Sequence, residues 1–443
     1  MTNETERPAA EEPVQGAVQE KIEEVVAIQE TVPQVTVVTE AAPHEPPPED
    51  PRPRRVPAWK KPEYRFIFRL TALALILALL AVAAAYLILP DKAYSASEKR
   101  MLTGPPSLTL DSLASGRFMD EIEDYAADQF PLRDFWMKAK TTFFRVMNMR
   151  ESQGVYLLSN GGLAERFDTP DEQNFTETTD AVRAFSERYP ETPMYFLLAP
   201  TAVSMLEDLL PKDAVTESQD AYIERLFATL PEGIRPIDVR AAFRSADDPA
   251  SLYYRTDHHW TTKGALFAYT TAKAVMGIDS DVTFSGGVAS NSFRGSLTGK
   301  SGFTVDPPDE LTIYLPENAP STFLYTVNYP DELRKTASVY DLDSLVSDDP
   351  YTVFFGSNHP LIEIDTTADT DRTLLVIKDS YANSFIPFAL TEFARIVLLD
   401  PRYYYDDIDV LMKAESFTDV LFLYNVNTLA ADTSLKVVLT NIQ

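Results

Sequence analysis

Apolar and polar positions follow different patterns in successive parts of the chain. The first fifty residues contain no Phe, Trp or Tyr and no sustained apolar period. Such a segment buries too little surface to offset the entropy of the chain, so we predict a disordered, acidic tail. The tail has a Pro-rich end, after which seven Lys and Arg residues follow between residues 52 and 69.

The strongest hydrophobic signal is the run at residues 70–89, which is apolar apart from Thr71 and Tyr86. As a helix rising ~1.5 Å per residue, this run matches the length of a hydrocarbon core roughly 30 Å thick. It lacks the polar stripe that the surface of a soluble helix would show. We predict an uncleaved transmembrane anchor. The alternative is a cleavable signal peptide, in which Ala83 and Ala85 mimic a cleavage site.

The basic flank lies on the N-terminal side of this run and sets the predicted orientation. Because positive flanks stay inside, residues 1–69 are expected in the cytoplasm and everything after Pro90 outside the cell. The protein is thus predicted to be a single-pass protein of the cytoplasmic membrane. Its exported part has no cysteine, which suits a cell surface where stability does not rely on disulfides.

Residues 90–150 are expected to form a helical neck between the anchor and the body of the protein. Apolar side chains recur at helical spacing, and Pro131 stands where a helix would begin. The apolar anchors are Phe118, Ile122, Tyr125, Phe130, Phe135, Trp136, Phe143 and Phe144. We expect them to pack on the body that follows.

Residues 151–443 alternate between short apolar runs and helical stretches. A hairpin with an Asn-Gly turn is predicted at residues 154–167. The other predicted elements are strands at 194–199, 234–239, 311–315, 351–355, 374–377, 395–399 and 420–424 and helices at 220–230 and 261–276. This alternation is typical of an α/β fold with a mostly parallel sheet covered on both faces. Residues 277–371 interrupt this alternation of strands and helices and are predicted to be a β-rich insertion over the edge of the sheet.

Composition narrows the range of functions. The 443 residues include 39 Lys and Arg against 67 Asp and Glu, a formal charge of −28, which argues against nucleic acid as a partner. The absence of cysteine excludes thiol nucleophiles and Cys-based metal sites. Only four histidines remain for imidazole chemistry, and two of them, His258 and His259, are adjacent.

Two segments carry the residues expected of a reactive site. Residues 256–261 place a carboxylate, two imidazoles and an indole before a helix, and residues 374–383 form an apolar strand that ends in Asp-Ser. Because ligands bind at the carboxyl ends of strands in open α/β sheets, Ser380 is placed as a nucleophile, with His259 as general base and Asp257 orienting the imidazole. On its own, Ser380 would be better explained as the N-cap of a helix at 381–390, and the histidine motif reverses that preference.

The strings DHHW at residues 257–260 and KDSYANSF at residues 378–385, with the anchor and the neck, resemble the bacterial DHHW family over roughly residues 95–440. This family is similar to alginate acetyltransferase-like proteins and, through them, to SGNH hydrolases. The resemblance implies a circularly permuted SGNH hydrolase-like fold. It also maps the family's dyad and nucleophile onto Asp257, His259 and Ser380.

The resemblance further implies that Asn425 joins the backbone N–H of Ser380 in an oxyanion hole. The sequence departs from the SGNH pattern in the same region. Lys378 stands where a Gly is usual, and Asp400 and Arg402 end the strand at which another Gly is usual.

The other residues near these segments carry weaker predictions. His258 is interpreted as a structural imidazole bonded to backbone, and Trp260 either walls the pocket or anchors the start of the helix. His44 lies in the tail, and His359 is expected in a loop that can line the cleft. A zinc site made from Asp257 and the three histidines after the anchor is conceivable. Adjacent histidines rarely suit one tetrahedral ion, however, so no metal or other cofactor is expected.

These observations predict a membrane-anchored, extracytoplasmic O-acetyltransferase or acetylesterase that acts on a cell-surface polysaccharide. Because common acyl donors are cytoplasmic, a transferase would need a partner, and the resemblance implies a membrane-bound O-acyltransferase. An esterase needs only water. The alternative is a catalytically silent glycan-binding or envelope-scaffold protein, with sugar-stacking surfaces at Trp260, Tyr381, Tyr403, Tyr404 and Tyr405.

The net acidity bears on the acceptor, because a negative surface repels a negative polymer. We therefore predict a neutral or zwitterionic glycan, unless Arg294, Lys300 and Arg402 gather into a basic groove beside Ser380. The segment from Phe293 to Lys300 is a candidate rim for such a groove, although it is also explained as an ordinary polar turn.

Overall fold

The computed structural model describes residues 62–440, except for residues 96–99, 110–111, 114 and 148. The predicted tail, including His44, and most of the basic stretch lie outside the described residues.

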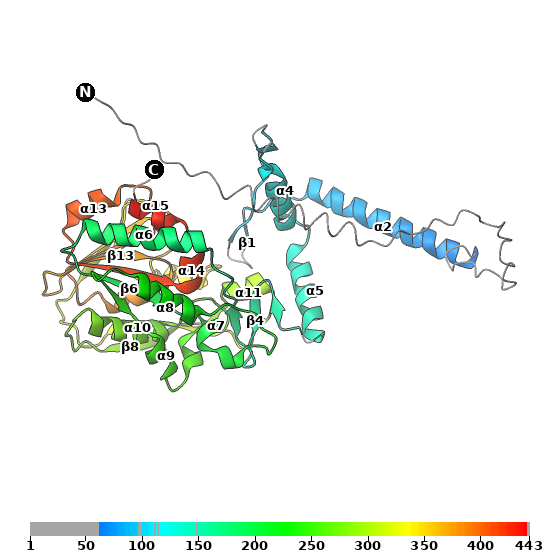
Figure 1. The fold of residues 1–443 in the computed structure, drawn as a ribbon. Coiled ribbons are helices and arrows are strands. Elements are labelled where there is room, and N and C mark those ends of the chain that lie inside the picture. The colour runs from blue at the N-terminus through cyan, green and yellow to red at the C-terminus, as the bar shows by residue number, and fades with distance from the viewer. Residues whose placement is uncertain (1–61, 96–99, 110–111, 114, 148, 441–443) are drawn as a thin grey trace, which may run out of the picture. The chain divides into compact units, whose positions relative to one another are not determined.

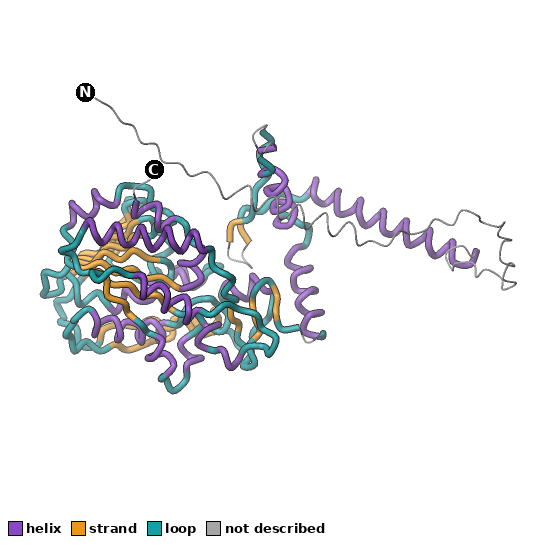
Figure 2. The backbone as a smooth tube through the Cα atoms, in the orientation of Figure 1, coloured by secondary structure: helices purple, strands orange, loops and turns teal. Residues whose placement is uncertain are grey.

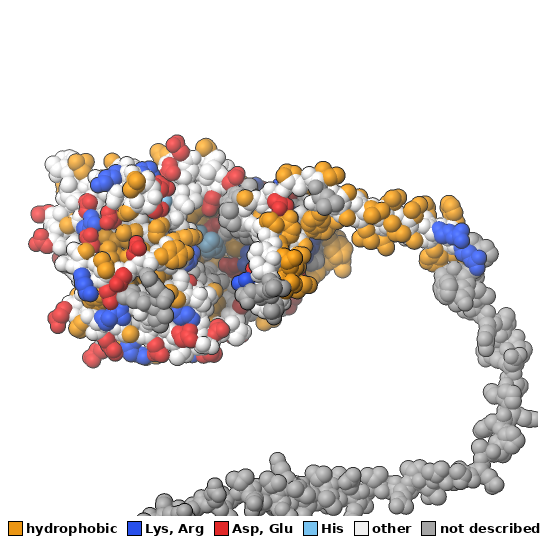
Figure 3. All heavy atoms as spheres, turned by 90° about the horizontal axis from the view of Figure 1, so that it is seen from above, with side chains coloured by type: hydrophobic (Ala, Val, Ile, Leu, Met, Phe, Trp, Pro, Cys, Tyr) orange, Lys and Arg blue, Asp and Glu red, His pale blue; other side chains and the backbone are white. Residues whose placement is uncertain are grey.

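The apolar run forms one long helix, α2 (Pro62–Ile88). Its segment Tyr64–Tyr86 has a mean hydropathy of 2.5 and is long and apolar enough to cross a membrane. The helix begins before the predicted residue 70, because Pro62 is compatible with a first helical turn and the aromatic residues that follow continue the apolar surface. Apolar side chains cover it in the space-filling view of Figure 3.

The neck is helical, as its periodicity predicts. It consists of α4 (Arg117–Asp128) and α5 (Arg133–Val146), preceded by the short strands β1 (Tyr94–Ser95) and β2 (Arg100–Met101), which pair in antiparallel fashion. Five of the predicted anchors nevertheless have exposed side chains, namely Ile122, Phe130, Phe135, Trp136 and Phe143. The expected burial of these side chains is therefore not found.

An eight-stranded sheet forms the core of the body (Figure 1). In spatial order the strands are β11 (Arg334–Thr336), β10 (Tyr325–Tyr329), β12 (Leu361–Thr366), β14 (Arg395–Leu399), β13 (Thr373–Lys378), β15 (Asp419–Asn425), β6 (Met194–Ala199) and β7 (Ile234–Ile237). The strands from β14 to β7 are parallel to one another, whereas β12, β10 and β11 extend one edge in antiparallel fashion. The result is a mixed sheet, partly parallel and partly antiparallel, within an α/β fold.

The central strands are apolar along their whole length because both faces of the sheet are covered. Every residue of β6 and β15 is buried. The helices of the body are α6 (Glu172–Arg188), α7 (Ala202–Met205), α8 (Gln219–Thr229), α9 (Arg240–Arg244), α10 (Thr262–Val275), α12 (Tyr381–Phe385), α13 (Ile408–Glu415), α14 (Val426–Ala431) and α15 (Ser434–Thr440). Figures 1 and 2 show α6, α13 and α15 along one side of the strands, and α10 along the other.

The segment 277–371 is rich in strands. Besides β10, β11 and β12, which join the main sheet, it contains a hairpin of β8 (Phe284–Phe293) and β9 (Asp309–Pro316) and the short helix α11 (Ser296–Ser301). The predicted hairpin at 154–167 is present as β4 (Val155–Leu157) and β5 (Leu163–Glu165). A third short strand, β3 (Glu151–Ser152), pairs with β4 on its other side. Its turn contains Gly161 at φ 81°, a conformation that favours glycine.

Two predicted elements differ from the structure. The segment at 351–355 is not a strand: Pro350–Val353 forms a 3-10 helix, with Asp349 capping the backbone N–H of Tyr351. The helix predicted at 381–390 ends at Phe385 and continues as a 3-10 turn, Ile386–Phe388. Pro387 lacks the N–H that a longer α-helix would need there.

Candidate active site

Ser380 lies at the carboxyl end of β13, directly before α12. Its backbone is already helical, at φ −66° and ψ −16°, and its side chain makes no capping hydrogen bond. The Oδ1 atom of Asp379 accepts from the backbone N–H of Tyr381 instead, at 2.8 Å. The alternative reading of Ser380 as an N-cap therefore does not describe this structure, and its hydroxyl is left for another partner.

The partner of that hydroxyl is His259. Its Nε2 lies 2.8 Å from Oγ of Ser380, and its Nδ1 lies 2.5 Å from Oδ1 of Asp257. Asp257 and His259 are both buried. The fold thus brings together three side chains in the order that serine nucleophile chemistry requires, although Ser380 is 121 residues away from His259 in the chain.

A tight loop before α10 presents Asp257 and His259. Tyr253 and Trp260 form a bridge that closes this loop, and Thr261 caps the helix by accepting from the N–H of Gly264. Asp309 of β9 accepts from the backbone N–H groups of Arg255 and Thr256, at 3.1 and 2.8 Å. These bonds attach the loop to the β8/β9 hairpin.

The carboxylate of Asp257 is held from a second side by the start of α11. Its Oδ2 accepts from the backbone N–H and the hydroxyl of Ser296, at 2.7 and 3.0 Å. Gly295 permits this approach, since a Cβ there would lie only 2.1 Å from the Cβ of Asp257. Sequence reasoning placed this segment at the rim of a groove and missed its contact with Asp257, although a Gly-Ser pair at a helix start was the available signal.

Tyr351 is a second residue that sequence reasoning missed. Its ring stacks on the ring of His259, with centroids 3.8 Å apart and planes at 10°. Its hydroxyl donates to the backbone oxygen of Ser380 and contacts Oγ of Ser384, both at 3.2 Å. The ring fixes the plane of the imidazole, and no signal within the sequence connects residue 351 to residue 259.

The electrostatics of the triad favour a neutral imidazole beside an ionised carboxylate. Burial, with His258 adding to it, lowers the pKa of His259 to about 4 despite the adjacent Asp257. Burial opposes ionisation of Asp257, but the two imidazoles and the hydrogen bonds from His259 and Ser296 hold the pKa of this carboxyl well below its ordinary value. At neutral pH, Nε2 of His259 can therefore accept a proton from Ser380.

Asn425 supports Asp379. Its backbone N–H and its Nδ2 donate to Oδ2 of Asp379, at 2.8 and 2.7 Å, and Nδ2 also donates to the hydroxyl of Thr428. The amide of Asn425 thus has both hydrogens engaged, and it is not set up here as the expected oxyanion donor. Burial raises the pKa of Asp379 to about 6. Within the described chain, the N–H of Ser380 donates to no protein acceptor.

The departures from the SGNH pattern form a buried ionic cluster. Nζ of Lys378 donates to Oδ1 of Asn383 at 2.9 Å and lies 3.5 Å from Oδ2 of Asp400. Arg402 donates to both oxygens of Asp400, at 2.8 and 2.6 Å. Arg402 is therefore already paired.

Trp260 and Tyr381 do not wall a pocket. Both are fully buried: Nε1 of Trp260 donates to the backbone oxygen of Tyr381 at 3.1 Å and to Oγ of Ser384 at 2.9 Å, while the hydroxyl of Tyr381 bonds to the backbone oxygen of His258. They anchor α12 against the DHHW loop. The suggested sugar-stacking role is wrong for these two and for the buried Tyr404, while Tyr403 and Tyr405 are exposed.

His258 is about one-third exposed, and its Nδ1 contacts the hydroxyl of Ser296 at 2.7 Å, a side chain and not the expected backbone group. Arg294 lies at the surface, where it donates to Val305 and Asp306. His359 is buried in its loop, with Nδ1 2.9 Å from Asp331.

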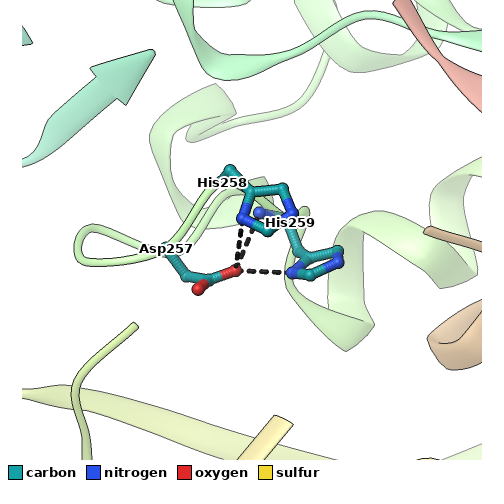
Figure 4. A group of neighbouring side chains, drawn as sticks. All are labelled: Asp257, His258 and His259. Carbon is teal, nitrogen blue, oxygen red and sulfur yellow. Dashed lines mark hydrogen bonds and ion pairs between the residues drawn. The ribbon is translucent and has the colours of Figure 1, made fainter. Parts of the chain in front are cut away.

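Asp257, His258 and His259 also offer three potential metal ligands, all within 4.8 Å of one another (Figure 4). Both Nδ1 atoms face Oδ1 of Asp257, at 3.6 Å from His258 and 2.5 Å from His259. An ion held by these atoms would take the same Nδ1 of His259 that now bonds to Asp257. His359 makes its contact with Asp331, away from this group.

Residues 188–399 match the family of DHHW proteins. No curated protein sequence matches the chain significantly. Among solved structures, the chain is similar to a DHHW family protein from Eubacterium siraeum, with 19% identity, a TM-score of 0.56, and coverage of 66% of this chain and 96% of that one.

The chain is also similar to Bacillus cereus PatB1 solved with a sulfonyl adduct, with 21% identity, a TM-score of 0.54, and coverage of 63% of this chain and 96% of that one. The O-acetyltransferase domain of Pseudomonas putida AlgJ gives 15% identity and a TM-score of 0.42, with coverage of 66% and 99%. At these identities, the DHHW protein and PatB1 show a shared fold.

Proposed function

We propose that this chain, of which residues 188–399 match the family of DHHW proteins, is a membrane-anchored, extracytoplasmic serine O-acetyltransferase or acetylesterase acting on a cell-surface polysaccharide. The observation that carries this proposal is the hydrogen-bonded row of Asp257, His259 and Ser380. Nδ1 of His259 lies 2.5 Å from Oδ1 of Asp257, and its Nε2 lies 2.8 Å from Oγ of Ser380.

In the proposed reaction, Nε2 of His259 takes the proton of Ser380 while Oγ attacks the carbonyl carbon of an acyl donor. The tetrahedral intermediate collapses when the donor's leaving group departs with that proton, which leaves an ester on Ser380. A sugar hydroxyl in the transferase, or water in the esterase, then gives its proton to His259 and attacks the ester. Ser380 regains the proton as the product leaves. We assign the unengaged N–H of Ser380 as an oxyanion donor.

The order of the parallel strands supports a circularly permuted SGNH-like fold. Their spatial order is β14, β13, β15, β6 and β7. Numbered from β13 onward and continued through the N-terminal strands, this order becomes 2-1-3-4-5, that of flavodoxin-like sheets. In this numbering Ser380 follows the first strand, and the Asp257–His259 loop comes after the fifth.

The anchor supports the extracytoplasmic part of the proposal. Helix α2 is long and apolar enough to span a membrane, and the basic flank before it favours a cytoplasmic N-terminus. A transferase on the outer side then depends on a membrane-bound O-acyltransferase to deliver acetyl groups.

The proposal is tested by p-nitrophenyl acetate hydrolysis with the detergent-solubilised full chain. Ser380→Ala and His259→Ala should each lower kcat by about 10³-fold or more, because each removes a member of one catalytic unit. Unchanged turnover in Ser380→Ala would reject the proposed enzymatic function. Absence of activity in the wild type, together with glycan binding that neither variant alters, would favour the silent glycan-binding alternative.

A further inference from the structure

Helix α5 of the neck carries an exposed apolar stripe. Six large apolar side chains in and beside the helix are each more than half exposed, namely Leu132, Phe135, Trp136, Phe143, Val146 and Met147. Because successive residues of an α-helix are turned by about 100°, the four that lie within α5 fall in a sector of about 100°. A contiguous apolar patch of this kind marks a surface that a partner or a membrane covers.

The neck is joined to the end of the candidate membrane-spanning segment of α2. Tyr86 is the last residue of that segment, and its hydroxyl donates to the backbone oxygen of Ala126 in α4. Its ring meets the ring of Phe130 edge to face, with centroids 6.0 Å apart. Lys92 and Gln129 add two hydrogen bonds, both at 3.0 Å. Since α5 begins three residues after Phe130, it begins close to the level at which α2 would leave the hydrocarbon core.

The charge of α5 is opposite to that of the chain as a whole. Its 14 residues include four cations and one carboxylate, whereas the chain carries −28 and α4 has five carboxylates and one cation. Arg133 lies 3.9 Å from Asp128 of α4, and the other cations of α5 are Lys138, Lys140 and Arg145. Helices that lie in the interface of a membrane typically combine Trp and Phe on one face with Lys and Arg elsewhere.

We propose that α5 lies in the outer surface of the membrane, with its apolar stripe among the lipids and its cations at anionic headgroups. A second copy of α5 fits the stripe less well, because it would bring two helices of net positive charge together. The inference rests on the anchor of the proposed function and is independent of the triad.

This placement has a consequence for the body of the protein. Four residues separate Val146, at the end of α5, from Glu151, the first residue of β3. Even a fully extended chain spans at most about 18 Å over these five steps. The first strand of the body is thereby held near the membrane surface, where a membrane-bound partner would deliver acetyl groups.

The experiment uses single labels, which the absence of cysteine from the chain makes possible. Val146→Cys places an NBD fluorophore on the stripe of the full chain, reconstituted at a high lipid-to-protein ratio in vesicles of phosphatidylcholine and phosphatidylglycerol. Lipids with a nitroxide near the headgroup should quench this label. Iodide, present on both sides of the membrane, should quench it about threefold or more weakly than a label in water.

Two variants serve as matched controls. Val346→Cys labels a side chain of the body that is 92% exposed, and iodide but not nitroxide lipid should quench it. Asp134→Cys labels α5 itself, about 200° around the helix from Trp136, and iodide should reach this label more readily than the one at residue 146.

Equal quenching by iodide at Val146→Cys and Val346→Cys would overturn the inference. A label at residue 146 that neither iodide nor nitroxide lipid quenches would also overturn it, since the body or a second copy would then cover the stripe. A chain that does not float with the vesicles would reject both the anchor and this inference. Loss of p-nitrophenyl acetate hydrolysis in Ser380→Ala would still support the triad in each of these cases.

Discussion

At the scale of single residues, the protonation of His259 sets the pH range in which Ser380 can be activated. Burial lowers the pKa of His259 to about 4, and below that pH the ring is protonated and cannot accept the proton of Ser380. We expect kcat/KM for p-nitrophenyl acetate to stay level through the ordinary histidine pKa of about 6.5 and to be halved near pH 4. A midpoint near 6.5 in the pH profile would contradict this.

Gly295 allows α11 to approach Asp257, and a methyl group there would displace the carboxylate. Because misplacing a catalytic group by about 1 Å costs on the order of 10²-fold, Gly295→Ala should lower kcat by about that factor. Gly287→Ala is the matched control, since no atom lies within 4 Å of its added Cβ. Equal activity of the two variants in the same ester assay would show that this contact does not position Asp257.

Sequence alone could place Ser380 and His259 because each signal is local: an apolar strand that ends in Asp-Ser, and an Asp-His pair before a helix. The supporting residues were not predictable in this way. Ser296 reaches Asp257 across 39 residues, and Tyr351 stacks on His259 from an insertion that carries no periodic pattern. The amide of Asn425 was misjudged because only the structure shows that Asp379 and Thr428 use its hydrogens.

At the scale of elements, Asp379 connects the end of β13 to the end of β15. Its Oδ2 accepts from the backbone and side chain of Asn425, and its Oδ1 accepts from the N–H of Tyr381. The amide of Asp379→Asn has only one acceptor oxygen, so its N–H₂ would face one of these donor groups and leave it unsatisfied. We expect a loss of about 1–3 kcal/mol in the free energy of unfolding. Urea denaturation measures it against Asp369→Asn, at an exposed residue in the connection before β13, and equal midpoints would contradict the proposed connection.

The central strands were predictable because burial on both faces leaves unbroken apolar runs, and β14 has the expected bounds, Arg395–Leu399. The strands at the antiparallel edge of the sheet were not predictable in this way. Strands β10, β11 and β12 are half polar and acquire their place only by pairing with one another and with β14. Tyr351, β-prone by type, lies instead in a 3-10 turn capped by Asp349.

At the scale of the whole molecule, we propose that α2 anchors the chain in the membrane and separates its two ends into different compartments. Protease added to intact cells should destroy epitopes after residue 100 and spare a tag at residue 1, because the basic flank keeps the N-terminus inside. The reverse protection pattern would contradict the topology. Edman sequencing of the membrane fraction should find no mature terminus near residue 86, where a cleaved signal peptide would end.

The net charge of −28 predicted repulsion of acidic polymers but not where the charges lie. In the structure, the three cations considered for a basic groove are each paired with a carboxylate: Arg294 with Asp306, Lys300 with Glu165 and Arg402 with Asp400. Pairing of this kind depends on contacts between distant segments, such as Lys300 with Glu165, and composition does not encode it.

The central claim is that His259 activates Ser380 to carry an acyl group. Its most direct test is mass spectrometry of the full chain after brief exposure to p-nitrophenyl acetate and an acid quench. We predict one acetyl group on the peptide that contains Ser380, lost in His259→Ala and retained in His258→Ala, since only His259 contacts the hydroxyl. Acetylation that falls elsewhere, or that persists at Ser380 without His259, would contradict the account.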